Sequence, residues 1–261
     1  MPTPAALKAF RSRIWRWFRK NARTFPWRET RDPYHILVSE IMLQQTQTER
    51  VKRFYERFIS SFPTLPSLAK APTRELLMLW QGLGYNRRAL ALRSLAREVC
   101  ANHGGVLPRT IAELEELPGV GPYTAGAVLA FAFGTPVVLI ETNIRNVLLE
   151  AFFRNRKNVK DAEILPVIAA CVSARDPRRW YWALMDYGAS LKSRSRGLNR
   201  LSAHYHRQSP FKGSNRELRG KIVKLLAEGR PGNCGLLCRI TGEKKERVRH
   251  VLQALANEGF L

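Results

Sequence analysis

The chain of 261 residues carries 44 Lys and Arg against 21 Asp and Glu, a formal net charge of +23. With 45% hydrophobic and 10% aromatic residues, it has a globular composition and the length to bury a core, which excludes an intrinsically disordered chain. A positive surplus of this size repels itself in the folded state and therefore indicates a polyanionic partner. Nucleic acid is the leading candidate, and a membrane surface or the ribosome is the alternative.

The sequence shows neither a membrane segment nor a disulfide framework. No run of 18 apolar residues occurs, and no apolar stretch follows the first basic residues, so we expect neither a membrane span nor a secretory signal. The four cysteines are Cys100, Cys171, Cys234 and Cys238, and the last two lack the His or further Cys partners of a zinc site. We expect reduced thiols in a cytoplasmic protein.

Helical periodicity dominates the order of the elements. Apolar residues recur at helical spacing, and Pro and Gly residues separate the segments. The predicted helices cover residues 5–20, 33–51, 73–81, 85–102, 110–117, 122–133, 143–153, 161–174 and 177–191, and a short apolar run occupies 137–140. The sequence therefore predicts an all-α protein.

The C-terminal part of the chain differs in kind. Residues 191–214 form a basic linker: the stretch 190–214 has six Lys or Arg and no acid. It is a solvated linker, a segment that lies on phosphates, or both. Residues 215–261 then predict three short helices and the start of a strand, the outline of a small winged-helix-like module. Its last helix, rich in Lys and Arg, can bind DNA; a plain packing domain is the alternative.

The most specific motif is Leu117-Pro-Gly-Val-Gly121, which lies between two helical segments. Two glycines with one residue between them permit a tight turn, and Pro122 suits the first turn of the next helix. The amides at that helix N-terminus face outward, where a phosphate can accept hydrogen bonds from them. With the small residues that follow at 124–127, this is the helix-hairpin-helix pattern; an ordinary tight turn is the alternative.

Several stretches in chain order resemble the MutY-type adenine DNA glycosylases of the helix-hairpin-helix (HhH-GPD) superfamily. They are Phe25-Pro-Trp-Arg28 with Asp32-Pro-Tyr34, Val38-Ser-Glu-Ile-Met-Leu-Gln-Gln-Thr-Gln47, Trp80-Gln-Gly-Leu-Gly-Tyr85, Leu117-Pro-Gly-Val-Gly-Pro-Tyr-Thr-Ala125 and Met185-Asp-Tyr-Gly-Ala189. Five matches in order and at the family's spacing are not expected by chance. The resemblance covers about residues 7 to 190.

The resemblance implies an all-α, two-lobed HhH-GPD glycosylase fold, followed here by the winged-helix-like module. One lobe would join residues 1–26 to 134–190, and the other, a six-helix barrel with the hairpin, would cover 27–133. The implied activity is the hydrolytic excision of an adenine-type base in base excision repair. We expect a monomer that acts on double-stranded DNA in the cytoplasm, associated with the nucleoid and not with a membrane.

The resemblance assigns catalytic positions to Glu40, Glu141, Asn143 and Tyr123. Glu40, among apolar neighbours, would stay protonated near neutral pH and protonate N7 of the departing adenine; a surface carboxylate is the alternative. Glu141 replaces the family's catalytic Asp, whose charge stabilises an oxocarbenium-like transition state. A helix N-cap is the alternative for Glu141 and is compatible with catalysis. Asn143 and Tyr123 match positions that hold the site and its water.

Tyr123 also bears on strand cleavage. Bifunctional relatives that resemble endonuclease III have a Lys at this place, and its amine attacks the sugar. A tyrosine cannot form that Schiff base, so we expect no AP lyase activity.

Further positions match the family's base pocket and DNA contacts. Trp27, Arg28 and Leu43 match the pocket walls, although Trp27 and Leu43 could be plain core residues. Gln45 and Tyr85 match residues that wedge into the duplex when the base leaves. The other DNA-binding candidates are the hairpin residues Gly119, Val120, Gly121 and Tyr123 and the basic residues Lys192, Arg194 and Arg196. No metal site is predicted, and a monovalent cation at the hairpin is the one candidate cofactor.

Three features depart from the family's pattern. The stretch after Ala189 has none of the four cysteines that hold a [4Fe–4S] cluster, so we expect no iron–sulfur cluster. We also expect no C-terminal domain of the kind that reads 8-oxoguanine in the family. Trp182 stands where the family has a Glu or Gln that reaches the exocyclic amine of adenine, and an apolar wall would better accept an alkylated amine. The expected base is therefore either mispaired adenine or an N6-modified adenine such as N6-methyladenine.

Two alternatives remain open. Tyr123 is also compatible with a mismatch thymine or uracil DNA glycosylase, although the stretch 39–46 favours the adenine branch. The replacement of Asp by Glu141 favours a non-catalytic DNA-binding protein on the same fold. If the catalytic interpretation holds, Glu40 and Glu141 should face each other across a cleft between the lobes.

Overall fold

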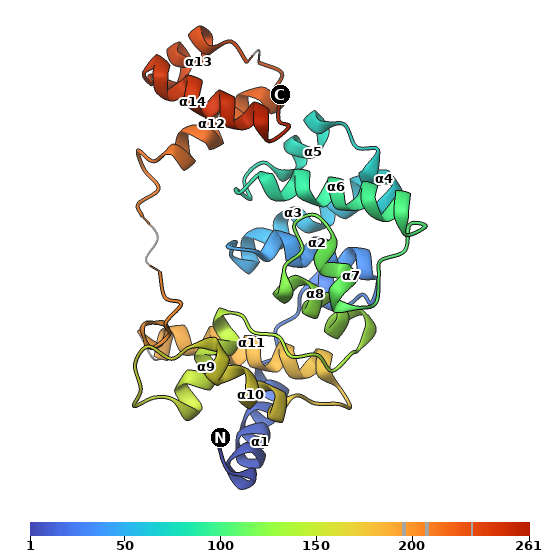
Figure 1. Cartoon of the computed structure of the whole chain (residues 1–261), viewed down its shortest axis with the longest axis vertical. Helices are drawn as coiled ribbons and strands as arrows, with labels where there is room; N and C mark the ends of the chain where they lie inside the picture. Colours follow the sequence, from blue (N-terminus) through green and yellow to red (C-terminus); the bar gives the residue numbers. More distant parts are fainter. Residues whose placement is uncertain (195–196, 207–208, 231) are drawn as a thin grey trace. The chain divides into compact units, whose positions relative to one another are not determined.

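The computed structural model describes residues 1–194, 197–206, 209–230 and 232–261, which form helices joined by short connections (Figure 1). Within these ranges no β-strand forms, and the β-bridge between Val159 and Ser202 is isolated. The predicted all-α class is therefore confirmed. The helices in the described ranges include none that is long and apolar enough to cross a membrane. The chain divides into two compact units, which are considered separately.

The first unit comprises Met1–Leu37, Arg109–Glu116 and Val120–Arg207. Its helical elements are α1 (Pro4–Asn21), η1 (Pro26–Arg28), α7 (Ile111–Glu116), α8 (Pro122–Val128), the π-helical turn η2 (Leu129–Phe133), α9 (Thr142–Phe152), α10 (Asp161–Cys171), α11 (Pro177–Arg194) and η3 (Leu198–Leu201). α11 packs against both α1 and α9. The buried residues Phe10, Ile14 and Phe18 recur every fourth position and give α1 one apolar face. Phe10 meets the buried Trp180 of α11 edge to face.

The second unit comprises Val38–Pro108, Leu117–Gly119 and Gln208–Leu261. α2 (Pro33–Leu43) runs from the first unit into the second, whose further helices are α3 (Thr48–Ser61), α4 (Leu65–Ala69), α5 (Thr73–Trp80), α6 (Arg87–Asn102), α12 (Asn215–Ala227), α13 (Cys234–Thr241) and α14 (Lys245–Asn257). α4 packs on α6, and α3 and α12 both pack on α5. Phe58 of α3 and Trp80 of α5 are fully buried, with ring centroids 5.6 Å apart.

The single helix predicted over residues 33–51 is broken in two. α2 ends at Leu43 and α3 begins at Thr48, because Gln45 between them has a left-handed backbone with φ of 53°. A right-handed helix cannot continue through such a residue. The apolar period gave no sign of the break, since residues 44–47 contain neither Gly nor Pro.

The division into units differs from the predicted lobes. Residues 27–37, 109–116 and 120–133, expected in the barrel lobe, belong to the same unit as α1 and residues 134–190. The physical reason is apolar packing. Ile36, Ala127, Ala130 and Phe131 lie in one buried cluster with side chains of α1, α9, α10 and α11.

Part of the predicted basic linker is folded. α11 extends to Arg194, and η3 lies against α9 with Leu198 buried. The Val159 amide donates to the Leu201 carbonyl at 2.8 Å, and the Ala203 amide donates to the Val159 carbonyl at 2.9 Å. These bonds tie residues 198–203 to the connection between α9 and α10.

α12, α13 and α14 form a three-helix bundle at the end of the chain, as the helical pattern predicted (Figure 1). α12 attaches this bundle to α5, where Arg74 Nε donates to the Ala227 carbonyl at 3.1 Å.

The predicted strand at the end of the module does not form. Gly259 has φ of 78°, its amide donates to Ala256, and the amide of the buried Phe260 donates to Leu255. This pair of bonds is a Schellman cap. The chain end therefore closes α14 and buries Phe260 instead of adding a wing.

Candidate active site

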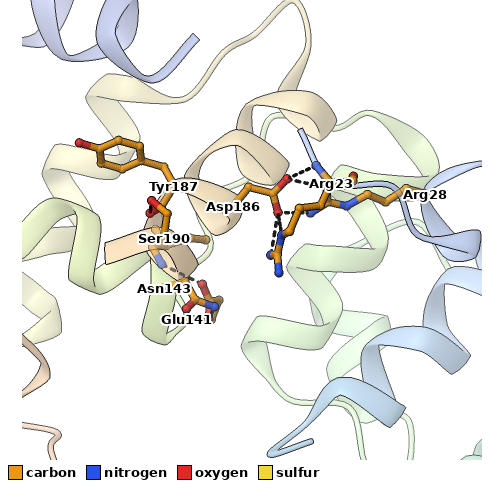
Figure 2. Close-up of polar contacts among 8 residues, drawn as sticks. Arg23, Arg28, Glu141, Asn143, Asp186, Tyr187 and Ser190 are labelled. Atoms are coloured by element: carbon orange, nitrogen blue, oxygen red, sulfur yellow. Dashed lines mark hydrogen bonds and ion pairs between the residues drawn. The ribbon is translucent and has the colours of Figure 1, made fainter. Parts of the chain in front are cut away.

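Glu141, the candidate catalytic carboxylate, is the N-cap residue of α9. One carboxylate oxygen accepts a hydrogen bond from the Ile144 amide at 2.8 Å, and the other accepts from Nδ2 of Asn143 at 3.1 Å (Figure 2). A helix N-terminus favours an anion because its unpaired N–H groups point at it. The N-cap alternative is therefore correct, and it fixes the direction of the carboxylate.

Asn143 contributes an unused acceptor beside this anion. Its Nδ2 donates to Glu141, while its Oδ1 is buried and has no hydrogen-bond partner among the described residues. A buried polar atom left in this state costs about 1–3 kcal/mol. The Asn143 Oδ1 is thus a place where a water or a ligand group is expected to donate.

Gly188 lets α11 approach Asn143 closely. A Cβ at residue 188 would lie 2.7 Å from the carbonyl carbon of Asn143 and 2.8 Å from its Cβ. Side chains in a close-packed interior do not approach so near, so a larger residue would push the two helices apart. This close approach gives the Met185–Ala189 stretch a physical role in placing the site.

The residues before Glu141 form an irregular run, with neither helix nor strand over residues 134–140. Tyr181 of α11 provides hydrogen bonds instead: its hydroxyl donates to the Val137 carbonyl at 2.7 Å and accepts from the Leu139 amide at 3.3 Å. Burial raises the pKa of Tyr181, so the hydroxyl stays protonated and able to donate. A Cβ at Gly126 of α8 would lie 3.3 Å from the Leu139 Cβ. The run is therefore held by α11 and α8, which determines where Glu141 lies.

Asp186 of α11 is a buried carboxylate with two arginine partners (Figure 2). It accepts from the backbone amide and Nε of Arg23 at 3.0 and 2.7 Å, and from both terminal nitrogens of Arg28 at 2.8 and 2.9 Å. Such two-pronged, charge-assisted pairs fix geometry strongly. Arg28, predicted as a pocket wall, therefore also holds residues 23–28 on α11.

Trp182 lies one turn before Asp186 and contacts two guanidinium groups. The guanidinium carbons of Arg178 and Arg28 lie 4.6 and 5.1 Å from its ring centroid, within the range of cation–π attraction. Two predicted base-pocket residues, Arg28 and Trp182, are therefore in contact.

Trp27 and Tyr123, two further predicted residues of the first unit, occupy different settings. Trp27 is 6% exposed and stacks on Phe25 with ring centroids 4.9 Å apart, so it has the burial of a core residue. Tyr123 lies in the first turn of α8, partly exposed and packed against the apolar cluster. Their roles in the pocket stay predictions.

Glu40 and Leu43 lie on α2, in the second unit. Glu40 is 4% exposed and its neighbours Ile41 and Met42 are fully buried, which rules out the alternative of a surface carboxylate. Leu43 is half-buried at the end of the helix. Because Glu40 and Glu141 belong to different units, the expectation that they face each other stays a prediction.

Gln45 and Tyr85 share a backbone conformation that is rare outside glycine. Their φ angles are 53° and 49°, and among the described non-glycine residues Asn158 alone joins them in the left-handed region. Both are exposed. The conformation costs about 1–2 kcal/mol per residue, and such strain gathers at functional sites. It suits the predicted wedge role, which stays a prediction.

The predicted hairpin connects α7 and α8. Gly119 has φ of 80°, and a Cβ there would lie 2.9 Å from the Ala91 Cβ, so the turn requires a glycine. Val120 is buried and Gly121 is the N-cap of α8. The side chains of Lys192 and Arg194, and the whole of Arg196, lie outside the described residues, so their contact with DNA stays a prediction.

Cys171 is buried in the first unit, and Cys100, Cys234 and Cys238 belong to the second. The absence of an iron–sulfur cluster stays a prediction. In the described ranges no group of three or more His, Cys, Asp or Glu could hold a metal ion.

Comparisons with known proteins agree with this fold. Residues 38–165 match the family described as "HhH-GPD superfamily base excision DNA repair protein". The adenine DNA glycosylase of Buchnera aphidicola is 35% identical over 182 residues, 69% of this chain and 52% of that protein. The thymine/uracil-DNA glycosylase of Methanothermobacter thermautotrophicus is 32% identical over 211 residues, 77% of this chain and 96% of that protein.

A solved structure supports the same assignment. A thermostable thymine-DNA glycosylase superposes with a TM-score of 0.66 at 31% identity, over 77% of this chain and 97% of that one. The chain therefore belongs to the HhH-GPD superfamily of base excision DNA repair proteins, with adenine DNA glycosylases among its relatives. It spans about half of the Buchnera relative that it matches.

Proposed function

We propose that the chain is a monofunctional DNA glycosylase that flips an adenine-type base out of double-stranded DNA and hydrolyses its bond to deoxyribose. The observation that carries the proposal is the Glu141–Asn143 pair, an anion of fixed direction beside a buried, unused acceptor. Relatives named adenine DNA glycosylase and thymine/uracil-DNA glycosylase support this class of reaction.

The pair suits the charge that develops in this reaction. As the bond between base and sugar breaks, positive charge builds up on the sugar ring. The Glu141 carboxylate, already oriented by the Ile144 amide and Asn143, can stabilise that charge without reorganising. Asn143 Oδ1 can accept a hydrogen bond from the attacking water. The base leaves with the bonding electron pair, water adds to the anomeric carbon, and the Glu141 carboxylate can accept the proton that the added water loses.

Glu40 is the proposed general acid. The departing base needs a proton, which in the adenine branch goes to N7. Burial disfavours the charged form of a carboxyl group, and Glu40 is almost completely buried. A proton held on Glu40 at neutral pH would therefore be available to the leaving base.

Tyr123 supports hydrolysis without strand cleavage. It lies in the first turn of α8, and the resemblance matches it to the lysine of the bifunctional enzymes. A phenol cannot form the Schiff base on which the lyase reaction depends. We propose that the product is an intact strand with an abasic site.

The base is proposed to be mispaired adenine or an N6-modified adenine. An indole offers one N–H donor and no acceptor, so Trp182 cannot accept a hydrogen bond from the exocyclic amine of adenine. A methyl group on that amine would meet an apolar ring at little cost. N6-methyladenine therefore belongs among the substrates to test.

Mismatched thymine or uracil is the second candidate. This chain spans 96% of the Methanothermobacter enzyme, and the thymine-DNA glycosylase structure is matched over nearly its whole length. A DNA-binding protein without catalysis is the third, because Glu141 replaces an Asp.

Cofactors and assembly are part of the proposal. We propose an enzyme without an iron–sulfur cluster, with backbone carbonyls of the hairpin as the candidate site for a monovalent cation. It would act as a monomer associated with the nucleoid.

Base release from end-labelled duplexes tests the proposal. The duplexes carry adenine opposite guanine or 8-oxoguanine, N6-methyladenine opposite thymine, or thymine and uracil opposite guanine. Glu141→Gln and Glu40→Gln should each slow release roughly 10²–10³-fold. Glu150→Gln on α9, where Glu150 pairs with Arg13, is the matched control and should release base normally.

Each outcome bears on one part of the proposal. Release from thymine or uracil duplexes alone would favour the second candidate. The absence of release from every duplex, or equal rates for Glu141→Gln and wild type, would reject the catalytic mechanism. Strand breaks that appear without alkali or heat would reject the monofunctional assignment.

A further inference from the structure

We propose that Arg88 is a positioning residue that joins the loops carrying Gln45 and Tyr85 into one rigid unit for displacing a base from duplex DNA. The inference rests on the proposed function, because it assigns the two exposed residues to the duplex. It concerns the second unit alone, to which both loops and Arg88 belong.

The first loop is held through the end of α2. Arg88 Nη1 donates to the carbonyl oxygens of Ile41, Met42 and Gln44 at 2.8, 2.9 and 2.5 Å. Arg88 Nη2 also donates to the Thr46 hydroxyl at 3.0 Å. The last carbonyls of a helix lack helical partners and attract cations. The Arg88 guanidinium therefore binds carbonyls at the end of α2 and a polar group on each side of Gln45.

The second loop is held by the same guanidinium. Nη2 donates to the Gly84 carbonyl at 3.0 Å and Nε to the Tyr85 carbonyl at 3.4 Å. The guanidinium carbon lies 5.5 Å from the Trp80 ring centroid and 5.4 Å from that of Tyr85. Both the backbone and the ring of Tyr85 are therefore in contact with Arg88.

These contacts explain how Gln45 and Tyr85 both keep a strained, left-handed backbone conformation. A left-handed, non-glycine residue is retained where its surroundings over-determine it. Gln45 and Tyr85 both have this backbone, and each is flanked by groups that Arg88 binds. Because the planar guanidinium of Arg88 binds both loops, a displacement of Gln45 or of Tyr85 strains the loop that carries the other residue.

Arg88 has little capacity left for DNA itself. Arginine has five N–H donors, and the guanidinium already serves six acceptors. Burial lowers the pKa of Arg88 to about 10, so the group remains charged at neutral pH. Its charge thus stays directed at the two loops, and its effect on DNA is exerted through Gln45 and Tyr85.

The test follows base displacement directly, with 2-aminopurine at the target position of a duplex as a fluorescent probe of unstacking. Arg88→Lys retains the charge but cannot reach both loops, because an ammonium group has three donors at one point. Arg93→Lys is the matched control. Arg93 lies on the same helix, is buried, and binds Ala71 and Thr73 instead. Thermal unfolding of both variants measures any general loss of stability.

We expect Arg88→Lys to slow displacement about 10- to 100-fold, since small misplacements of positioning groups have effects of this size. Arg93→Lys should leave it unchanged at a comparable loss of stability. The decisive comparison is a double-mutant cycle with Gln45→Ala and Tyr85→Ala. If Arg88 acts through Gln45 and Tyr85, Arg88→Lys has almost no further effect on displacement once both of these residues are alanine.

The outcomes separate this inference from the proposed function. The inference would be overturned if Arg88→Lys slowed displacement equally with and without the Gln45 and Tyr85 side chains. The same slowing by Arg88→Lys and Arg93→Lys would also overturn it. A wild-type chain that does not displace 2-aminopurine would overturn it as well. If the wild type displaces the probe but releases no base from any duplex, the proposed function fails while the role of Arg88 is still decided.

Discussion

The carbonyl carbon of Asn143 lies 2.7 Å from the point that a Cβ of residue 188 would occupy, so α9 and α11 meet backbone to backbone at Gly188. Gly188→Ala should therefore destabilise the chain by about 1–3 kcal/mol, as over-packing does in other cores. Base release should fall with it, because Asn143 and Glu141 move. Urea unfolding and release kinetics measure the two effects.

A second glycine is the control for this change. Gly220 is exposed on α12 and has no atom within 4 Å of its added Cβ. Gly220→Ala should stabilise by about 0.5–1 kcal/mol, because alanine is the better helix former. Equal stabilities for Gly188→Ala and the wild type would contradict the close approach.

Tyr181→Phe should destabilise the irregular run before Glu141. The change removes the hydroxyl that serves Val137 and Leu139, which leaves buried backbone groups unpaired and costs about 1–3 kcal/mol. Base release should slow as well. Tyr205→Phe, at an exposed tyrosine, is the control and should alter neither property.

The same substitution has a pH signature. Burial raises the pKa of Tyr181 in the folded chain above the value of about 10 that holds in the unfolded chain. Between these two values the folded state binds the additional proton, so the free energy of unfolding falls as pH rises above about 10. Unfolding free energies from pH 8 to 11 should show a shallower alkaline decline for Tyr181→Phe than for the wild type. Parallel declines would refute the assignment.

The exposed face of α14 should contribute to DNA binding. Lys245 and Arg249 are exposed one turn apart, whereas Arg247 of the same helix pairs with Glu243. Lys245→Ala with Arg249→Ala should lower the slope of log affinity against log salt by about 1.8, the release of counterions from two phosphates. Titrations of a long duplex over a range of salt concentrations measure it.

A pair of α12 lysines provides the matched control. Lys221 pairs with Glu217 of the same helix and Lys224 with Glu228, its C-cap residue. Replacement of both lysines by alanine removes the same net charge. If both double variants change the salt slope equally, net charge and not α14 is responsible.

The purified chain should contain no iron–sulfur cluster. The stretch after Ala189, where the resembled family has its four cluster cysteines, contains no cysteine over residues 190–214. Iron analysis should give far less than one iron per chain, and a chelator should not lower the melting temperature. Four irons per chain with visible absorption would contradict this prediction.

Much of the fold followed from local pattern. Helical periodicity placed most helices within a few residues, and the two glycines of Leu117–Gly121 predicted the hairpin between α7 and α8. These features depend on residues near each other in sequence, so the sequence displays them. The break at Gln45 was missed because residues 44–47 contain neither Gly nor Pro, and Arg88, which binds the Gln44 carbonyl, lies more than forty residues away.

The supporting residues of the site were the least predictable part. Glu141 and Asn143 were found from the resemblance, whereas Tyr181 and Gly188 act on residues that lie far from them in sequence. Asp186 and Gly188 both lie in the quoted stretch Met185–Ala189, which was the available signal. The sequence around Asp186 and Gly188 does not show which distant residues these two contact.

The hydrogen bonds between Tyr181 and the irregular run before Glu141 also determine how this region opens. In a sheet, each amide is protected by a neighbouring strand and exchanges when that strand leaves. Here the Leu139 amide is protected by the hydroxyl of one side chain, so a displacement of the Tyr181 side chain away from the run can expose the amide. Local openings of this kind cost less free energy than global unfolding. Hydrogen exchange at Leu139 would therefore record how often the segment leading to Glu141 comes loose in the native protein.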